Sequence, residues 1–359
     1  MPTLLFWGRK NVKLYNLGKV PWYESQTIYH ALGYLGREAL SLVSPATPYA
    51  CIGFHQDVEQ EVDLGFCREN KIPVFRREVG GGAVYLDGNQ LFYQLILRKD
   101  NPLVPLKKET FYRKFLEPVI RVYQRIGIPA KYKPINDLMA GTRKISGTGA
   151  GEIGDCIVFV GNLILDFNYE MMARILKVPD EKFRDKIHKT MVDNLSTIRR
   201  ELGEKEASLW DEASLNALLA EEYEKAVGPM EPSEKDQALQ NEMDDLETRM
   251  SSEAWLYQKG RQIHGRDVKI RAGVNVVHKM YKAQGGLIRA DYEVMEGKLT
   301  HVSLSGDFFC YPEKAIEQLE AKLEGQPLEE AIILLHQFYS KGDIEIPGIS
   351  IEDWASLFR

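Results

Sequence analysis

The sequence predicts a large α/β part followed by a smaller α+β part. The chain has 359 residues, which at about 150 residues per domain corresponds to roughly two domains. Through the first two thirds, apolar runs typical of buried strands alternate with stretches of helical spacing. Acidic residues and turn formers dominate 228–252, and strand patterns followed by helix patterns come after them. We therefore predict domains at 1–228 and 253–359, separated by an acidic connector at 229–252.

In the large part, Pro21 precedes a predicted helix at 22–32, because Trp22, Tyr29 and Leu32 share one face and proline suits a first turn. A helix is also expected at 58–70, between strands at 48–54 and 72–77. We expect the strands at 72–77 and 90–97 to pair through an intervening glycine loop and a turn at 87–89.

Further elements follow from the same patterns. We predict helices at 111–126, 169–176 and 208–227, strands at 130–132, 138–140 and 157–165, and a solvated helix within the connector at 234–250. The small part is predicted to contain strands at 268–276, 286–295 and 300–305, and then helices at 313–323 and 328–339.

Composition excludes several classes of protein. Hydrophobic residues make up 44% and charged residues 27%, as in an ordinary folded protein. The formal charge of −6 disfavours a nucleic-acid partner, which would require a basic patch. The longest apolar stretch, 156–165, is shorter than the roughly 18 residues of a membrane span. With no basic region before an apolar stretch at the N-terminus, we expect a cytoplasmic protein without a membrane partner.

The cysteines and histidines do not suggest a metal centre. None of the four cysteines forms a CxxC pair, and the seven histidines show no ligand spacing. A disulfide framework and a structural zinc site are therefore not predicted.

The first motif that could carry chemistry is Arg76-Arg77-Glu-Val-Gly80-Gly81-Gly82-Ala-Val. Three consecutive glycines between apolar strands suit a backbone that approaches a ligand closely and presents N–H groups. The arginines could receive phosphate or carboxylate oxygens. The alternative is a flexible hairpin with a solvated basic pair. Neither a dinucleotide-binding GxGxxG nor a P-loop is present.

The second motif is Asn136-Asp137 followed by Gly141-Thr-Arg-Lys144-Ile-Ser-Gly147-Thr. The flanking glycines constrain the backbone, so the Lys144 ammonium can be aimed at one point, where it would stabilise negative charge as an acyl phosphate forms. Asp137 would hold a metal–phosphate pair or orient Lys144. The alternative is a surface turn with an exposed lysine. A third motif, Gly161-Asn-Leu-Ile-Leu-Asp166, is a core strand in which Gly161 marks a close backbone approach to a ligand.

These motifs, in this order and at these spacings, resemble the lipoate–protein ligase family, which belongs with the biotin ligases and octanoyltransferases. The resemblance covers roughly 22–202. It continues more weakly through Trp255 and Gly306-Asp-Phe-Phe309, similar to the accessory C-terminal domain of long-form ligases. It implies a mixed-sheet catalytic domain of the biotin/lipoate ligase type.

The resemblance also implies an activity and a site. ATP and Mg²⁺ would serve to activate lipoate or octanoate to acyl-AMP, and a monomeric enzyme would transfer the acyl group to a lysine of a lipoyl-carrier protein or domain. Lys144 corresponds to the catalytic lysine, Asp137 to a magnesium ligand, and Arg76 to a residue flanking the acyl site. The remaining acyl- or adenylate-binding positions that it implies are Gly80, Gly81, Gly82, Ala83, Val84, Asn89, Asn136, Asp137, Ser146, Gly147, Thr148 and Gly161.

Three positions depart from the pattern of the family. Val79 stands where serine is usual, Leu86 where histidine precedes Asp87, and Val160 where histidine precedes the glycine of the third motif. These changes place the chain on a divergent branch and concern the acyl-end contacts and the choice of acceptor.

Two alternatives remain open. An octanoyltransferase would use a cysteine, and Cys156 is the candidate, although its place at the start of an apolar strand favours a buried inert thiol. The other alternative is a non-catalytic lipoyl-binding protein that kept the fold.

Overall fold

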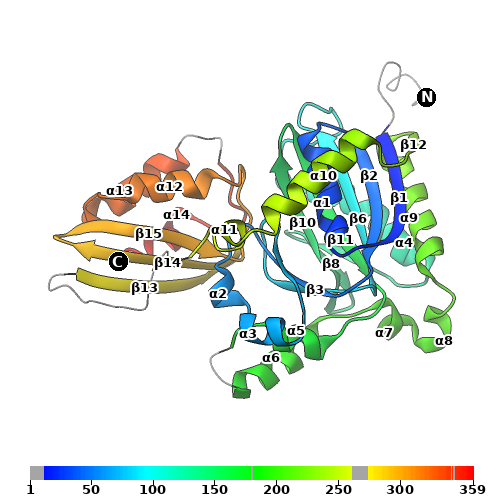
Figure 1. Ribbon diagram of the computed structural model, residues 1–359, viewed down its shortest axis with the longest axis horizontal. Helices are drawn as coiled ribbons and strands as arrows, with labels where there is room; N and C mark the ends of the chain where they lie inside the picture. Colours follow the sequence, from blue (N-terminus) through cyan, green and yellow to red (C-terminus); the bar gives the residue numbers. More distant parts are fainter. Residues whose placement is uncertain (1–11, 179–180, 261–273, 341, 343) are drawn as a thin grey trace.

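The computed structural model describes residues 12–178, 181–260, 274–340, 342 and 344–359 (Figure 1). The large part is built on a mixed sheet covered by helices on both faces, and the small part is a three-stranded sheet covered by helices on one face. The predicted fold class is therefore confirmed. Among the described residues, no helix is both long enough and apolar enough to cross a bilayer.

The main sheet has six strands in the order β10-β11-β6-β2-β1-β12. Neighbours from β10 to β2 run antiparallel, whereas β2, β1 and β12 run parallel. Strands β1 and β2 were not expected from the sequence. The bounds are β1 Val12–Val20, β2 Ala39–Pro45, β6 Gln90–Arg98, β10 Thr148–Ile153, β11 Cys156–Ile164 and β12 Met230–Pro232.

Two pairs of helices bury the two faces of this sheet. One face packs against α4 (Lys108–Arg125) and α9 (Glu212–Val227), and the other against α1 (Glu24–Tyr34) and α10 (Gln237–Met250). The ends of α9 follow from its sequence. Asp211 and Ser214 form a capping box at its start, and Gly228, with φ +94°, ends it.

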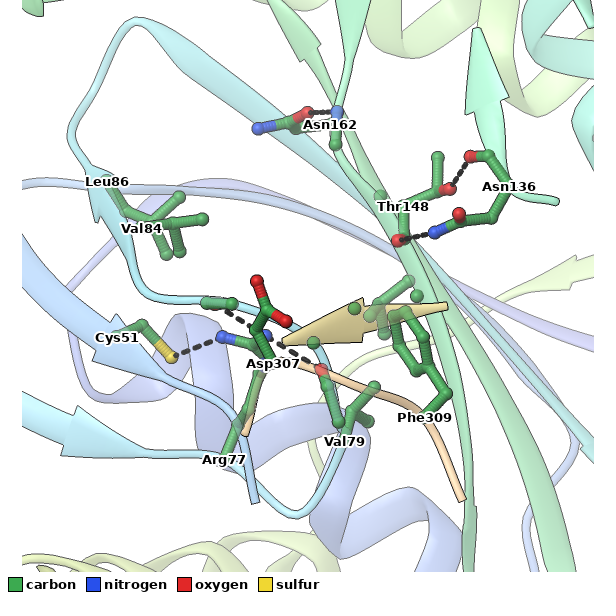
Figure 2. A pocket seen from close by; sticks show the side chains of 18 of the residues that line it. Cys51, Arg77, Val79, Val84, Leu86, Asn136, Thr148, Asn162, Asp307 and Phe309 are labelled. Atoms are coloured by element: carbon green, nitrogen blue, oxygen red, sulfur yellow. Dashed lines mark hydrogen bonds between the residues drawn. The ribbon is translucent and has the colours of Figure 1, made fainter. Parts of the chain in front are cut away.

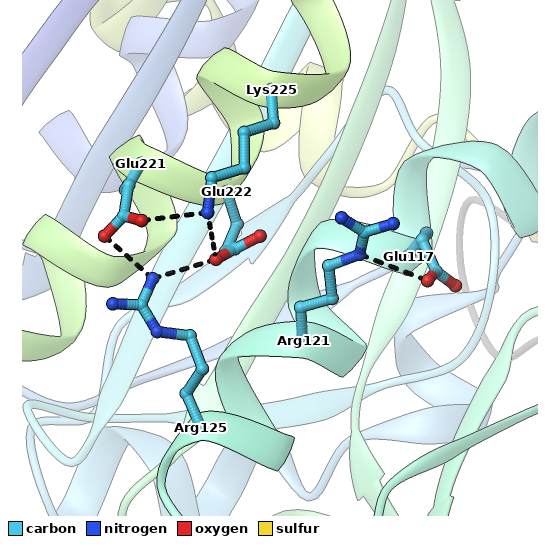
Figure 3. A network of polar contacts seen from close by, with 6 residues as sticks. All are labelled: Glu117, Arg121, Arg125, Glu221, Glu222 and Lys225. Carbon is cyan, nitrogen blue, oxygen red and sulfur yellow. Dashed lines mark hydrogen bonds and ion pairs between the residues drawn. The ribbon is translucent and has the colours of Figure 1, made fainter.

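Charged residues on α4 and α9 pair across the contact between these helices (Figure 3). Arg125 Nη1 lies 2.8 Å from carboxylate oxygens of both Glu221 and Glu222, and Lys225 Nζ lies 2.8 Å from the same two groups. Glu222 is only 3% exposed, so its charge is compensated by two cations at the edge of the core.

Two small sheets complete the large part. One has the order β4-β3-β5 (Val74–Arg76, Tyr49–Ile52, Val84–Leu86), and the other β7-β8-β9 (Lys131–Lys133, Asp137–Ala140, Arg143–Ser146). The expected pairing of the strands on either side of the glycine loop is wrong. Both β4 and β5 pair with β3, while β6 joins the main sheet between β2 and β11.

The helix expected at 58–70 is two helices, α2 (Val58–Glu61) and α3 (Leu64–Glu69), because the Asp63 carboxylate accepts from Phe66 N and begins a new helix. The remaining helices of this part are α5 Tyr169–Ile175, α6 Glu181–Asn194, α7 Ile198–Leu202 and α8 Glu204–Ala207. A short helix, α11 (Glu253–Leu256), lies between α10 and the small sheet in the chain.

The helix expected in the connector exists as α10, but it is not solvated on all sides. Leu239, Met243, Leu246 and Met250 are buried on its inner face and join the core beneath α1. The preceding strand, β12, pairs with β1. Residues 230–250 thus pack as part of the large unit.

The small part contains β13 (Val274–Ala283), β14 (Gly286–Met295) and β15 (Lys298–Gly306), followed by α12 (Ala315–Leu323), η1 (Leu328–Glu330), α13 (Ala331–Tyr339) and α14 (Ile351–Ala355). Residues 268–273 of the strand expected at 268–276 lie outside the described residues.

Candidate active site

A cavity of about 440 Å³ lies where the main sheet, the β4-β3-β5 sheet and the small part meet (Figure 2). Its lining comes from both parts of the chain. The expected site residues that line it are Gly80, Gly81, Gly82, Val84, Asn136, Lys144, Gly147, Thr148 and Gly161. Residues of three motifs that are spread over 80–161 are therefore brought together in one cavity.

The glycine loop, Gly80–Gly82, lies against the small part. Gly81 has φ +90° and donates its N–H to the carbonyl oxygen of Phe308 at 3.0 Å. A Cβ atom at Gly81 would lie 2.9 Å from the Phe309 ring, and one at Gly80 would lie 2.5 Å from Phe308 O. Glycine is needed at these positions because the chain turns with positive φ and meets another backbone closely.

Lys144 and Asp137 form an ion pair at one side of the cavity. Their Nζ and Oδ1 atoms are 2.7 Å apart, and the side chains are 38% and 28% exposed. Lys144 lies on β9 and Asp137 begins β8, and Lys144 pairs with Met139 in the ladder between these strands. The ammonium is thus held by a carboxylate from the neighbouring strand while its own side chain lines the cavity.

Side-chain amides fix the backbone next to Lys144. Asn136 Nδ2 donates to Thr148 O at 2.8 Å, and the Thr148 hydroxyl donates to Asn136 O. Gly147 N donates to Asn162 Oδ1 at 2.8 Å (Figure 2). Asn162 Nδ2 in turn donates to Gln90 Oε1 at 2.9 Å. These bonds tie the β9–β10 turn to β11, so the lysine projects from a rigid frame.

One wall of the cavity is apolar. It includes all three positions at which the chain departs from the family pattern, and its side chains are Val79, Val84, Leu86, Phe92 and Val160. The departures therefore concentrate on the surface that a bound molecule would touch, and they make it more apolar.

The expectation for Arg76 is wrong. Arg76 is fully buried away from the cavity, and its guanidinium donates to the carbonyl oxygens of Gly53, Phe54, Gln56, Trp255 and Leu256. Burial lowers the pKa of Arg76 to about 10. Adjacent side chains of an extended segment point in opposite directions, so only one of the two arginines can reach the cavity.

Arg77 is the arginine that lines the cavity. Its Nη2 donates to Gly80 O at 2.8 Å and Gly82 O at 3.0 Å, and its Nη1 lies 3.6 Å from Cys51 Sγ (Figure 2). The guanidinium thus spans the glycine loop and fixes its shape. In the sequence this residue is marked only by the consecutive pair Arg76-Arg77, which does not show which of the two side chains faces the cavity.

Four other expected residues do not line the cavity. Asp137 touches it only through Lys144, and Ser146 is buried and donates to Asn162 O at 2.7 Å. Ala83 packs into a separate cluster of buried side chains. Asn89 is exposed, and its carbonyl oxygen accepts from Leu165 N at 2.9 Å.

Gly161 lines the cavity, but its lack of a side chain has another cause. A Cβ atom there would lie 2.2 Å from the hydroxyl oxygen of Tyr93. The sequence predicted a close approach to a ligand at Gly161, whereas the structure shows a close approach to Tyr93, a core tyrosine on β6.

The small part supplies lining residues that the sequence did not predict: Lys282, Gln284, Gly285, Gly286, Asp307 and Phe309. The segment leading from Phe309 reaches the large part at alternate positions. Phe309 lies against the glycine loop and Gly149, Tyr311 donates to Ala150 O at 3.0 Å, and the Glu313 carboxylate accepts from Glu152 N. The sequence shows the phenylalanine pair after Gly306, but it does not show which surface of the large part this pair contacts.

The cysteines offer no activated nucleophile. Cys156 is fully buried outside the cavity, and burial raises the pKa of its thiol to about 11. Cys51 does line the cavity, and burial raises the pKa of its thiol as well. Raised pKa values leave both groups as neutral thiols.

Comparison with known proteins identifies the family. A family model for the lipoyl protein ligase A/B catalytic domain matches residues 26–217, more than half of the chain. The chain belongs to this family. A second model, for the C-terminus of bacterial lipoate protein ligases, matches residues 276–357 of this member of the lipoyl protein ligase family. Both parts of the resemblance drawn from the motifs are thus confirmed.

Individual relatives agree with this assignment. Lipoate–protein ligase 1 of Staphylococcus aureus is 26% identical over 307 residues, which covers 83% of this chain and 85% of that protein. The bi-partite lipoate protein ligase from Thermoplasma acidophilum, described with its E2 lipoyl domain, superposes with a TM-score of 0.60 at 22% identity, covering 71% of this chain and all of that one. A lipoate-protein ligase A bound with ATP gives 0.56 at 20% identity, covering 69% and 99%. These structural likenesses concern the fold.

Proposed function

We propose that this member of the lipoyl protein ligase family activates lipoate or octanoate with ATP and transfers the acyl group to a lysine of a lipoyl-carrier protein or domain. The observation that carries the proposal is one cavity that joins an apolar wall to a lysine held by a carboxylate. A carboxylic acid with an apolar chain needs both surfaces, since each buried methylene contributes about 0.8 kcal/mol of binding and the carboxylate needs a cation.

In the first step, a carboxylate oxygen of the acid attacks the α-phosphorus of ATP, an acyl–phosphate bond forms, and pyrophosphate leaves. Lys144 is proposed as the catalytic residue, because its ammonium can stabilise negative charge on both the carboxylate and the α-phosphate. Arg77 replaces Arg76 as the proposed cation at the glycine loop. In the second step, the acceptor amine attacks the acyl carbonyl carbon, AMP leaves, and the amine loses a proton.

A magnesium ion would require few protein ligands here. No group of three or more ligating side chains is present in the part of the chain that the structure describes. Mg²⁺ at nucleotide sites usually takes one or two carboxylates and completes its shell with phosphates and water. Asp137 fits that pattern, and we propose it as the one carboxylate for the ion, which would neutralise phosphate charge.

For the organisation of the chain, we propose an accessory domain at 253–359. The packing of β12 and α10 supports counting 229–252 with the catalytic domain at 1–228, in place of a separate connector. We further propose that the enzyme acts as a monomer in the cytoplasm.

The test compares Lys144→Ala with Lys131→Ala, an exposed lysine on β7 of the same small sheet. Lys144→Ala should lower lipoate-dependent ATP–pyrophosphate exchange by at least 100-fold and leave the urea midpoint unchanged, whereas Lys131→Ala should keep both. A folded Lys144→Ala protein that still forms lipoyl-AMP at a near-normal rate would refute the assigned role.

The cysteine-dependent transferase is tested separately. It predicts acyl transfer from a carrier without ATP, abolished by Cys156→Ala. We expect Cys156→Ala to retain full ATP-dependent ligation, because its thiol is buried outside the cavity. ATP-independent transfer that disappears in this variant would favour the transferase. A protein that binds neither ATP nor AMP by calorimetry would favour the non-catalytic alternative.

A further inference from the structure

Gln94 lines the cavity, and the carbonyl oxygen of its side chain is buried without a hydrogen-bond partner. Gln94 lies on β6, is 1% exposed, and lines the cavity. Its Nε2 donates to Ser25 O at 2.7 Å, while its Oε1 has no hydrogen-bond partner among the described residues. The Ser25 carbonyl fixes the amide orientation, because a flipped amide would set two acceptor oxygens against each other.

The strand register places Gln94 away from the Lys144 side of the cavity. Phe92 pairs with Asn162, which holds the β9–β10 turn next to Lys144. Gln94 pairs with Val160, one row farther along the same sheet face. Two residues along a strand correspond to about 7 Å. The row formed by Val160 and Gln94 therefore lies farther from Lys144 than the row formed by Asn162 and Phe92.

The end of the cavity near Gln94 is closed by α1, and the polar groups there are already paired. Gln26 Nε2 donates to the Tyr49 hydroxyl at 2.6 Å, and the Tyr29 hydroxyl donates to Gln26 Oε1 at 3.1 Å. Both Gln26 and Tyr29 line the cavity. Among the described residues that line the cavity, Gln94 is the one with a buried side-chain oxygen that lacks a partner.

We propose that this end of the cavity recognises an acyl chain whose far end carries a hydrogen-bond donor, a thiol or a hydroxyl, which Gln94 Oε1 accepts. The proposal rests on the ligase function, since it deepens the choice of acid. A chain that ends in a methyl group leaves a buried carbonyl oxygen unpaired, whereas a chain with a terminal donor satisfies it. Gln94 is then a residue that determines specificity.

A neighbouring group provides the competing explanation. Ser41 lies directly opposite Gln94 on β2, is fully buried, and its Oγ also lacks a partner. Ser41 does not line the cavity. A trapped water shared by the two side chains would satisfy both without any bound acid. In that case the two residues would matter equally for stability and neither would affect the choice of acid.

The experiment measures kcat/KM for ATP–pyrophosphate exchange by the full-length protein with octanoate, 8-hydroxyoctanoate and the dithiol dihydrolipoate. We expect the wild type to favour at least one of the two donor-bearing acids over octanoate by about tenfold, and the two arms distinguish a hydroxyl from a thiol. Gln94→Met, which keeps the length of the side chain but removes the acceptor, should reduce that ratio to about one. Ser41→Ala should keep the wild-type ratio.

Equal kcat/KM values for the three acids in the wild type would overturn the proposal without any variant, and so would an unchanged ratio in Gln94→Met. Loss of the preference in Ser41→Ala to the same extent as in Gln94→Met would also overturn it, in favour of the shared water. A wild-type protein that activates none of these acids, and does not activate lipoate either, would contradict the ligase function instead. The two failures are therefore distinguishable.

Discussion

Replacing Arg76 by methionine should destabilise the protein without removing a group from the cavity. The Arg76 guanidinium joins two distant segments of the chain, the turn at 53–56 and the end of α11. Methionine has a similar length and an apolar end, so it fills the space but donates no hydrogen bond. The variant therefore removes the polar link between these segments and little else.

The contacts set the magnitude. Three of the distances from Arg76 are 2.8 Å or shorter, to Phe54 O, Gln56 O and Leu256 O. A hydrogen bond from a charged donor contributes about 1.5–3 kcal/mol. The variant loses these bonds, but it also avoids the desolvation cost of burying a charge, which offsets part of the loss. We expect a net loss of about 3 kcal/mol in the free energy of unfolding.

Urea unfolding and ATP–pyrophosphate exchange measure the two consequences separately. Arg76→Met should shift the urea midpoint to lower concentration and keep exchange activity below the transition. The matched variant Arg77→Met should do the reverse, because Arg77 lines the cavity and spans the glycine loop. If folded Arg76→Met lacks exchange activity while Arg77→Met retains it, the assignment of the two arginines is reversed.

Two further predictions follow from the docked small part. Gly81→Ala should lower exchange activity at least tenfold, because φ +90° and the 2.9 Å approach to Phe309 leave no room for a methyl group. Gly82→Ala should have a smaller effect, because the nearest atom to its Cβ would be 3.7 Å away. Similar losses of activity in the two variants would contradict the steric argument. Burial raises the pKa of the Glu313 carboxyl from an ordinary value of 4.5 to about 8. Between these pH values the native protein keeps a proton that the unfolded chain has released. The free energy of unfolding should therefore fall as the pH rises through this range. Glu313→Gln should flatten that fall between urea midpoints measured at pH 5.5 and 8.5, and an unchanged slope would contradict the role of Glu313.

The hydrophobic pattern of the sequence predicted those helices and strands whose formation depends mainly on their own residues. The helix at 111–126 and the strand at 90–97 are present as α4 and β6, because their periodicity reflects one buried face or burial on both faces. The charged helix at 234–250 appeared solvated because its four buried apolar residues are spaced among many acidic ones. Its docking onto α1 is a tertiary choice that the pattern does not state.

The site shows the same division. The sequence motifs indicated Gly80–Gly82 and Lys144 as site residues, with a hairpin and a surface turn as alternatives, and all four residues line the cavity. The choice between Arg76 and Arg77 depends on one residue of register, which the sequence leaves open. Phe309 and Asp307 enter the cavity only because the small part docks there, and no short-range pattern reports such a contact.

The position of β12 affects how the protein can be made. Its partner β1 lies at the start of the described chain, roughly 200 residues earlier, and the two pair from Val12 with Met230 to Leu14 with Pro232. On the ribosome, the edge of β1 that pairs with β12 remains uncovered until residues 230–232 have emerged. An open strand edge invites pairing with other chains. Fragments that stop before residue 230 lack β12, so we expect them to aggregate during expression.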